Sequence, residues 1–510
     1  MAAKTSAKAG AVGNLVDRVI GYLAPVRGLR RVQARNMLTR AYEGASKRDG
    51  WNPQRAGASA NADHAADARE LRSRARALVQ NVPYIAQGMR SLVANIVGNG
   101  ILPNWTGQNA DVLNTLWKRW VKEADADGRV DLYGLQAAAY RAMEQDGEVL
   151  VRFRPRLMSD GLAVPLQLQL LEIDWLDSGK SGVLANGGRI VNGIEYDPLG
   201  RVGGYWLFDE HPGENVAVLS RNGKSRRVDA IYVCHLYTPD RPGQGRGFTR
   251  LAPVVATVRD LQLYEDAEMA RKNLESRLGV IGSGDVDLLG GQGMQGLGGG
   301  AAQTWRAGDM GELPSGTMMQ VPPGTSLTVV EPKAMPGYVD YVKHKLHVIA
   351  AGMGVTYEML TGDVTEVNFS SARVRMLDFR REAELTQWTL LIPRLCERIA
   401  QEFEDAAALG NKIDRARYQV EHSTPKWSYV DPAKEVRADL DEISGGLSSI
   451  SEKLRQRGYR PDDVFRELAE DITKLRALGI FDALMTLRTG QKARDEEVPE
   501  KAKEKASASG

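Results

Sequence analysis

Cysteine is scarce in this chain, whose 510 residues include only Cys234 and Cys396. Two cysteines so far apart exclude the disulfide framework of a small secreted domain. Both lie in apolar runs, "AIYVCHLY" and "LIPRLCERIA", where a small buried thiol packs well. The sequence therefore favours a reducing compartment.

Long hydrophobic runs are also missing. No stretch approaches the roughly 18 apolar residues that a membrane-spanning helix needs. The beginning, "MAAKTSAKAGAVGNLVDRVI", lacks the continuous apolar segment of a secretory signal. We therefore expect a protein that is made in the cytoplasm and stays soluble.

An excess of either charge is absent, because 67 Lys and Arg residues face 65 Asp and Glu residues, for a net charge of +2. A balanced charge gives no overall attraction to nucleic acid or to an anionic membrane. Any contact with DNA must therefore come from a local arrangement of residues.

A complete cofactor-binding motif is missing too. The segment "GGQGMQGLGGG", residues 290–300, places Gly291, Gly293 and Gly296 in the spacing of a dinucleotide-binding loop. Such a loop follows a buried strand, opens a helix and has an acidic residue about 20 positions on. The preceding "VIGSGDVDLL" is a weak strand, and the following "GGGAAQTWRAG" cannot start a stable helix. We interpret the glycines as a loop tip that binds no cofactor.

Other catalytic and metal-binding patterns fail in the same way. Val218 occupies the position where a phosphate-binding loop ending at Ser225 requires glycine. The run 123–128 resembles the first half of a calcium loop, but Gly134 stands where the bidentate carboxylate is needed, so we expect a solvated turn. The six histidines share no zinc-like spacing with cysteine or carboxylate. The chain is therefore predicted to have no metal, no cofactor and no enzymatic activity.

The N-terminal half reads as an α+β body. Residues 1–60 are rich in Ala, Arg and Gly and are expected to form a flexible arm. Apolar residues at helical spacing predict two helices between Asp63 and Asn95, with a break at Pro83. Trp117 and Trp120, three residues apart, are expected to anchor the core from one helical face. From "EVLVRFRP" to "VDAIYVCHLY" the pattern becomes β-rich.

The C-terminal half is dominated by helical patterns. The longest runs from about Thr249 to Leu278, followed by a Gly-rich segment and two short strands up to residue 335. Further helices are predicted at 338–351 and 372–407, with Leu377, Leu385 and Trp388 among the apolar positions of the second. Three short helices follow, and the charged end from about 489 is expected to be disordered.

Several segments in combination resemble the portal proteins of lambda-type tailed bacteriophages. They cover most of the chain, from about Ala68 to about Gly479, and are "RARALVQNVPYIAQGMRSLVANIVGNGI", "GEVLVRFR", "LQLLEIDWLD", "GIEYDPLGRVGGYWLFDEHPGE" and "HLYTPDRPGQGRGFTRLAPVVATVRDLQLYEDAEMARKNLESRLGVI". The resemblance implies an α+β portal fold with an α/β wing, paired long stem helices, a small β-containing clip and a helical crown.

The resemblance divides the chain into eight consecutive parts. They are a flexible arm at 1–60, the wing at 61–247, a first stem helix at 248–278, the clip at 279–335, a second stem helix at 336–352, a wing return at 353–430 that contains the tunnel loop 362–371, the crown at 431–488 and a disordered tail at 489–510.

The implied function is a ring of about twelve copies at one capsid vertex. The terminase motor drives double-stranded DNA through such a ring, and the DNA later leaves by the same path. The implied partners are other copies of the chain, terminase, major capsid and scaffold proteins, and head-completion or tail-connector proteins. The implied location is the virion, with the host cytoplasm during assembly.

The resemblance also implies functional residues. The candidates that face the DNA are Asp363, Thr365, Glu366, Asn368, Arg373 and Arg375. The candidates for stem contacts between copies are Val258, Leu261, Met269 and Leu274. An aspartate at Leu261 or Met269 is expected to block ring assembly and leave the subunit folded. The cluster Arg373, Arg375, Arg380 and Arg381 is explained most simply by ion pairs with a neighbouring copy.

Two alternatives stay open at this stage. If the chain is an enzyme that binds a nucleotide at the Gly291–Gly296 loop, nucleotide binding should be measurable and the substitution Gly293→Val should abolish it. A helix-turn-helix reader at 449–480 would bind a duplex site tightly and in a salt-sensitive manner, although acidic residues crowd that segment.

Overall fold

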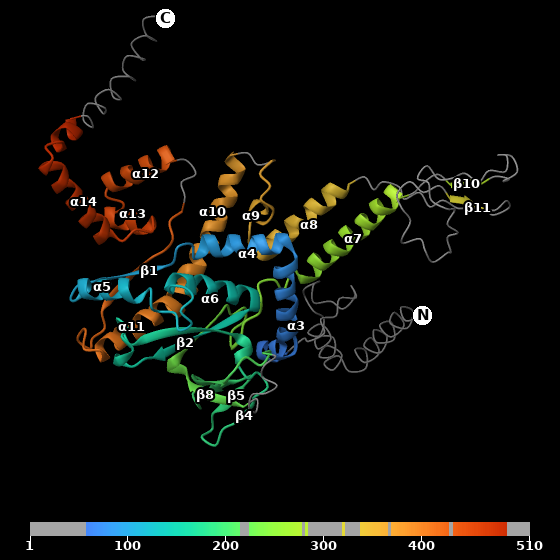
Figure 1. The fold of residues 1–510 in the computed structure, drawn as a ribbon, viewed down its shortest axis with the longest axis horizontal. Coiled ribbons are helices and arrows are strands. Elements are labelled where there is room, and N and C mark those ends of the chain that lie inside the picture. Colours follow the sequence, from blue (N-terminus) through green and yellow to red (C-terminus); the bar gives the residue numbers. More distant parts are fainter. Residues whose placement is uncertain are drawn as a thin grey trace, which may run out of the picture. The chain divides into compact units, whose positions relative to one another are not determined.

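The computed structural model describes residues 58–214, 224–277, 281–283, 319–321, 337–365, 369–427 and 432–486 (Figure 1). By its contacts the chain divides into Met1–Ser59 and Ala60–Gly510, and the named helices and strands lie in the second unit. Among the helices described, none is long and apolar enough to cross a membrane.

Two helices open the second unit, as the sequence predicts. They are α3 (Ala60–Asn81) and α4 (Pro83–Ile96). The break falls at Pro83, which has no N–H to donate and is tolerated in the first turn of the second helix. After α4, Gly98 and Gly100 adopt φ values of +50° and +104°, which glycine reaches without a steric cost.

Helices α5 (Ala110–Trp120) and α6 (Leu132–Asp146) follow, and α6 leads directly into the main sheet. Asp131 caps α6 by accepting a hydrogen bond from the Gly134 backbone N–H at 2.8 Å. Gly147 ends α6 with φ +93°, and a Cβ there would lie 2.5 Å from the carbonyl carbon of Phe248. Only glycine therefore allows this close approach between the end of α6 and the segment before the next long helix.

Apart from one short parallel pair, the strands described form small antiparallel sheets. The inner sheet has the order β3-β2-β9, and a second sheet is a meander of order β4-β5-β6-β7-β8. A short pair, β1 with β12, joins Leu102–Thr106 to Gln419–Ser423 across most of the chain. The remaining bounds are β2 Glu148–Pro155, β3 Leu166–Glu172, β4 Gly182–Val183, β5 Arg189–Val191, β6 Ile194–Tyr196, β7 Val202–Phe208, β8 Ser225–Asp229 and β9 Val233–Tyr237.

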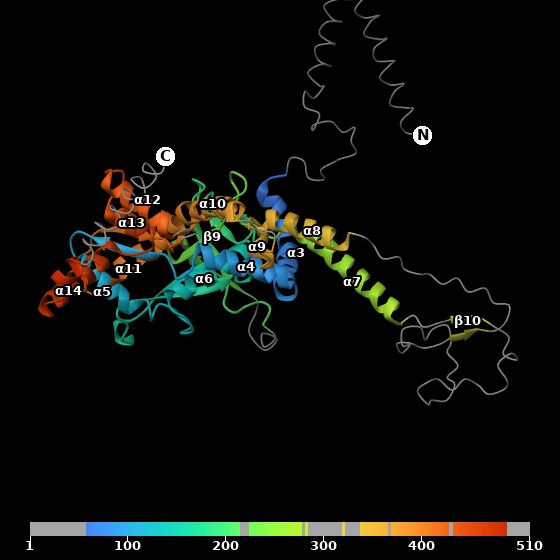
Figure 2. The ribbon, with the colours of Figure 1, turned by 90° about the horizontal axis from the view of Figure 1, so that it is seen from above.

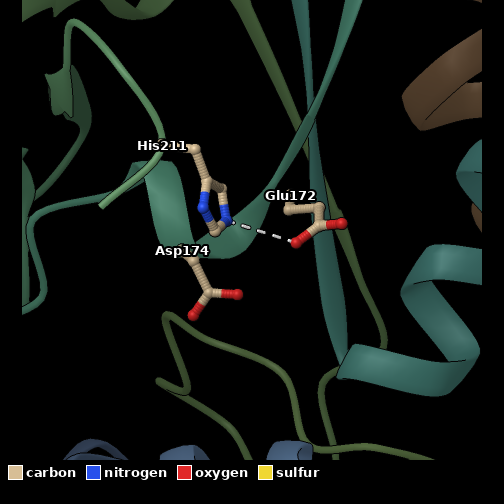
Figure 3. Close-up of side chains that lie close together, drawn as sticks. All are labelled: Glu172, Asp174 and His211. Atoms are coloured by element: carbon tan, nitrogen blue, oxygen red, sulfur yellow. Dashed lines mark ion pairs between the residues drawn. The ribbon is translucent and has the colours of Figure 1, made fainter. Parts of the chain in front are cut away.

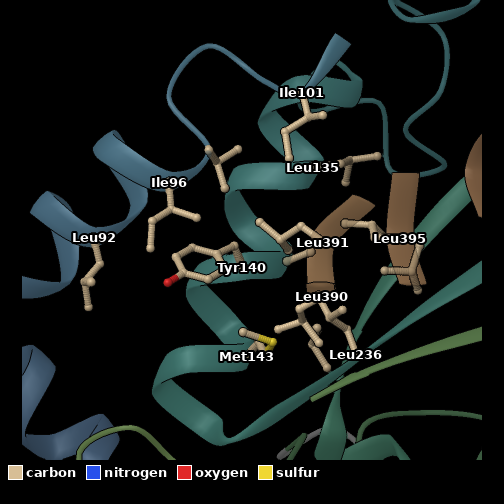
Figure 4. Close-up of a cluster of buried hydrophobic side chains, with 14 of the residues drawn as sticks. Leu92, Ile96, Ile101, Leu135, Tyr140, Met143, Leu236, Leu390, Leu391 and Leu395 are labelled. Carbon is tan, nitrogen blue, oxygen red and sulfur yellow. The ribbon is translucent and has the colours of Figure 1, made fainter. Parts of the chain in front are cut away.

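The main core lies between these helices and the inner sheet. Figure 4 shows α4, α6, β9 and the segment around Leu391 contributing to one apolar cluster. The predicted anchors Trp117 and Trp120 are 2% and 0% exposed, which confirms their core role. Together with Trp105 they surround Phe403, at ring-centroid distances of 5.0–5.5 Å. Cys234 and Cys396 are buried free thiols, as their apolar surroundings predict.

The long helix α7 spans Val255–Arg277 and runs beside α8 (Tyr338–Met353), as both ribbon views show (Figures 1 and 2). Tyr264 of α7 joins them, with its ring 5.8 Å from Tyr338 and 4.6 Å from Tyr341. The helix starts at Val255, six residues later than predicted, and Pro253 lies in the turn that leads into it. Of the predicted clip strands, the structure describes β11 (Met319–Val321), which pairs in parallel with β10 (Ile281–Ser283).

The predicted helix 372–407 is longer and not uniform. It comprises α10 (Phe369–Thr386), a π-helical segment (Gln387–Cys396) and α11 (Glu397–Leu409). Pro393 lies inside the π-helical segment, where its missing N–H removes a regular helical hydrogen bond. The short helix α9 (Tyr357–Thr361) precedes α10.

Three helices follow, as predicted: α12 (Pro432–Ser444), α13 (Ile450–Gln456) and α14 (Pro461–Ala477); the described chain then ends in a further helical stretch at 481–486. Ser449 caps α13 by accepting from the Glu452 N–H at 3.0 Å. Polar side chains connect α13 and α14 to the body. Arg455 pairs with Glu421 at 2.7 Å, and Lys118 with Asp463 at 3.1 Å.

Candidate functional site

The start of the predicted tunnel loop lies between α9 and α10. Asp363 accepts hydrogen bonds from the Thr365 backbone N–H at 3.0 Å and from the Thr365 hydroxyl at 2.7 Å. These hydrogen bonds hold the pKa of the Asp363 carboxyl below its usual range. The loop therefore keeps the negative charge of Asp363. Glu366 and Asn368 lie outside the described residues.

The two arginines predicted to face DNA lie on α10, and one of them is already paired. Arg375 forms an ion pair with Glu358 of α9. Burial opposes the ionisation of Glu358, but hydrogen bonds and the Arg375 guanidinium hold its pKa below the ordinary value. Arg373 is half-buried near the start of the helix. The structure thus brings Asp363, Thr365 and Arg375 to one region and satisfies the charge of Arg375 within it.

Other arginines of the basic cluster also have partners within the chain. Arg381 pairs with Asp378 at 3.4 Å, one turn before it on α10. The guanidinium of Arg380 lies over the ring of Trp427, 5.3 Å from its centroid. Arg375 and Arg381 thus form ion pairs inside one chain, and the expected ion pairs with a neighbouring copy stay a prediction.

The candidates for stem contacts divide into buried and exposed residues. Val258 and Leu261 are 1% and 3% exposed and belong to the main core. Met269 is 62% exposed, and the surroundings of the Leu274 side chain are not described. An aspartate at Leu261 would put a carboxylate into the core, so we expect this variant to destabilise the subunit itself, and its effect on ring assembly stays a prediction.

The structure contains a buried ionic centre around Glu148 that was not predicted from the sequence. Glu148 begins β2, is fully buried, and accepts hydrogen bonds from Arg246 at 2.6 and 2.7 Å. His235 of β9 lies at 2.9 Å, and His64 and Arg72 of α3 at 3.3 and 3.4 Å. Burial alone would raise the pKa of Glu148, but Arg246 and the two histidines hold it well below its usual range. Burial lowers the pKa of His235, so its imidazole is neutral and donates from Nε2.

The same centre continues toward a second group of charges. Arg72 pairs with Asp174 at 3.1 Å, while Arg76 pairs with Asp146 at 2.5 Å and with Asp174 at 2.6 Å. Acidic and basic groups balance, as a buried cluster requires. The centre fixes α3, the start of β2, β9 and the segment before α7 to one another, and this is a structural role.

Glu172, Asp174 and His211 form a group that has the residue types of a metal site (Figure 3). His211 Nε2 lies 3.3 Å from Glu172, but its Nδ1 accepts the Gly213 backbone N–H at 3.1 Å. The proton of the neutral ring is therefore on Nε2, which leaves no lone pair there for a metal. Arg76 contacts both carboxylates, at 3.2 Å and 2.6 Å, and supplies the positive charge. The group is best explained as an ion-pair network.

The run that resembles a calcium loop is a turn with exposed residues at 127–130, as expected, and hydrogen bonds to Asp125 hold it in place. Asp125 is 6% exposed and accepts the backbone N–H groups of Asp127, Arg129 and Val130 at 2.8–3.1 Å. Its oxygens are thus already used by the turn.

The segment predicted as an alternative DNA reader does form two helices, α13 and α14. In a helix-turn-helix reader, the beginning of the second helix contacts base edges. Here Asp462 accepts from Asn104 at 3.1 Å and Asp463 pairs with Lys118. The beginning of α14 is therefore acidic and bound to the body of the same chain. The glycine loop of the enzyme alternative lies outside the described residues.

Comparison with known proteins gives a consistent result. Residues 45–387 match the family described as phage portal protein, lambda family. The chain is 27% identical over 442 residues to a probable portal protein of Halomonas phage phiHAP-1, covering 82% of this chain and 83% of that protein. It is 23% identical over 164 residues to a portal protein of Escherichia phage N15, covering 28% and 29%.

The solved structures that match the chain include chains from gene transfer agent particles. A chain from the neck of a native particle, computed with C12 symmetry, has 17% identity and a TM-score of 0.41, covering 77% of this chain and 94% of that one. A chain from the virion of a native particle has 14% identity and a TM-score of 0.37, covering 78% and 94%.

The family match spans well over half of the sequence, so the chain belongs to the lambda family of phage portal proteins. This is a structural family of virion components. A role in DNA packaging fits membership of this family.

Proposed function

We propose that the chain works as a closed ring of about twelve copies at one vertex of the capsid. Terminase drives double-stranded DNA inward through this ring, and the DNA leaves by the same channel. The observation that carries the proposal is the family match from 45 to 387, which spans the inner sheet, α7, α8 and the α9–α10 region. No catalytic step and no cofactor is assigned to the chain.

The parts of the chain are assigned accordingly. Residues 61–247 form the wing and 353–430 its return. The antiparallel pair α7 and α8 forms the stem, the residues between them form the clip, and 431–488 form the crown. The clip is proposed to bind terminase during packaging and head-completion proteins afterwards. Capsid and scaffold proteins are proposed to bind during assembly in the host cytoplasm.

The charges suit a channel that lets DNA slide. Each phosphate that a protein neutralises adds affinity through counterion release, so a conduit must hold DNA weakly. Asp363 keeps its negative charge, and the charge of Arg375 is balanced by Glu358. Among the DNA-facing candidates, Arg373 is the cation without a described ion pair. We therefore propose that contact with DNA in this region is weak and non-specific.

The test is the mass of the purified full-length chain by native mass spectrometry. A ring of about twelve copies would have about twelve times the 55.9 kDa of one chain. A single species near that mass supports the proposal. A stable monomer or dimer over a range of salt and protein concentrations would contradict it.

A further inference from the structure

A pocket of about 380 Å³ lies where the turn between α13 and α14 and the beginning of α14 meet β1, α5 and α6. Its volume falls in the range of pockets that bind small molecules or single side chains of a partner. Most of the residues that line it are apolar or aromatic: Leu102, Trp117, Val121, Tyr133, Tyr459 and Val464. We call it the α14 pocket.

The α14 pocket is also lined by a buried cation that has no counter-charge. Arg460, the residue before α14, is 8% exposed. Its Nη2 donates a hydrogen bond to the Pro103 carbonyl, while its Nε is buried without a hydrogen-bond partner among the described residues. In the described part of the chain, Arg460 takes part in no ion pair. A buried guanidinium without a carboxylate is costly, so this group has unused capacity to bind an anion.

The other charges of the pocket limit which anion fits. Lys118 and Asp463 line it as well, but they pair with each other at 3.1 Å. Glu467 adds a negative charge and is exposed. A ligand with several negative charges, such as duplex DNA or a phosphate dianion, is repelled by Asp463 and Glu467. The buried guanidinium therefore fits a single carboxylate, and the apolar lining fits an apolar group attached to it.

We propose that the α14 pocket binds a carboxylate carried on an apolar group, with the Arg460 guanidinium as its counter-charge. Two sources share this chemistry: a small organic acid and the C-terminal carboxylate of a protein chain that ends in an apolar residue. The residues that line the pocket all belong to one chain, so the proposal does not rest on the proposed ring and can fail or succeed independently of it.

The first experiment measures binding of three probes to the full-length chain by isothermal titration calorimetry. Benzoate carries a carboxylate on an apolar ring, benzamide is its neutral counterpart, and inorganic phosphate is an anion without an apolar group. We expect benzoate to bind with a dissociation constant of about 1 mM or below, and the other two probes to bind at least about tenfold more weakly. Equal binding of benzamide, equal binding of phosphate, or no binding of benzoate at all would overturn the proposal.

The second experiment compares Arg460→Met with Arg466→Met. Arg466 lies on the same helix, does not line the pocket, is 58% exposed and pairs with Asp111 at 3.4 Å. We expect Arg460→Met to weaken benzoate binding at least about tenfold and Arg466→Met to leave it unchanged. Far-UV circular dichroism and the melting temperature show whether each variant is folded. Unchanged benzoate binding in a folded Arg460→Met variant would place the ligand elsewhere and overturn the assignment.

A third variant keeps Arg460 and so decides the question even if Arg460→Met does not fold. Glu467→Gln removes an exposed like charge from the lining, and we expect it to strengthen benzoate binding. Unchanged or weaker binding would contradict a carboxylate in this pocket.

N-acetylphenylalanine, which reproduces the end of a protein chain, distinguishes the two sources. Tighter binding of this probe than of benzoate supports a chain end as the ligand, and weaker binding supports a small acid.

Discussion

Arg246 donates two hydrogen bonds to Glu148, at 2.6 Å from Nε and 2.7 Å from Nη2, although 98 residues separate them. Both side chains are almost completely buried. We predict that Glu148→Gln destabilises the folded subunit by about 3–5 kcal/mol, because it leaves buried guanidinium groups without a counter-charge. Urea unfolding followed by circular dichroism measures this change.

Glu70→Gln is the control for this variant. Glu70 pairs with Arg74 at 2.8 Å, but both side chains are more than half exposed. Removing such a pair is expected to change stability little. Equal effects of the two substitutions would show that the Glu148 centre does not hold the fold together.

The imidazole of His422 gives a prediction about pH. Burial lowers the pKa of His422 to about 4, and its Nε2 is buried without a hydrogen-bond partner among the described residues. A histidine with a lowered folded pKa does not affect stability above its unfolded pKa of 6.5. Below that value the unfolded chain gains the proton first, so stability falls progressively between pH 6.5 and about 4, by about 3 kcal/mol in total.

We expect His422→Gln to remove this part of the pH dependence, as measured by the urea midpoint at pH values from 7 to 4. The exposed His344 is the matched position, and His344→Gln is expected to keep the full profile. An unchanged slope in the His422 variant would refute the assignment.

On α7, the burial of two residues predicts opposite results for the same substitution. Leu261→Asp is expected to destabilise the subunit by about 3 kcal/mol or more, because the carboxylate enters the apolar core. Met269→Asp is expected to leave the melting temperature nearly unchanged, because the side chain is 62% exposed. Differential scanning fluorimetry distinguishes them. If Met269→Asp also prevents ring formation while the subunit stays folded, the proposed stem role of α7 gains support.

Gly147 gives a test of backbone geometry. Gly147→Ala combines a positive φ with a clash, because the new Cβ would lie 2.5 Å from the Phe248 backbone. Gly107 has a similar φ of +83°, but a Cβ there would meet nothing within 4 Å. We expect Gly107→Ala to cost about 1–2 kcal/mol from φ alone and Gly147→Ala clearly more. If both variants lose the same free energy of unfolding, measured by heat or urea, the backbone near Phe248 moves away from the new Cβ without loss of stability.

Local signals in the sequence were sufficient where the structure depends on neighbours along the chain. Pro83 predicts the break between α3 and α4 because proline has no N–H to donate to the preceding turn of helix, and this effect is local. Trp117 and Trp120 predict the core for a similar reason, because large indoles at helical spacing share a face. The helical pattern of 372–407 was also read correctly, although the π-helical segment around Pro393 was not.

The sequence was insufficient where partners come from distant segments. The partners of the Glu148 carboxylate are residues 64, 72, 235 and 246, which lie far from it in the sequence. Its only local signal was a single charged residue at the start of an apolar strand. Periodicity places Leu261 and Met269 on one apolar pattern but cannot say which of them a neighbouring element covers. For the same reason the sequence shows Trp388 only as an apolar position of a predicted helix, while in the structure it is 55% exposed.

The polar attachment of α13 and α14 has a consequence for how the protein responds to its surroundings. Lys118 and Asp463 are 54% and 41% exposed, so salt screens their attraction, over about 8 Å at physiological ionic strength and about 3 Å at 1 M. The apolar core has no such dependence. We therefore expect the Lys118–Asp463 contact between α14 and the body to weaken as salt rises, while the fold of the body stays unchanged.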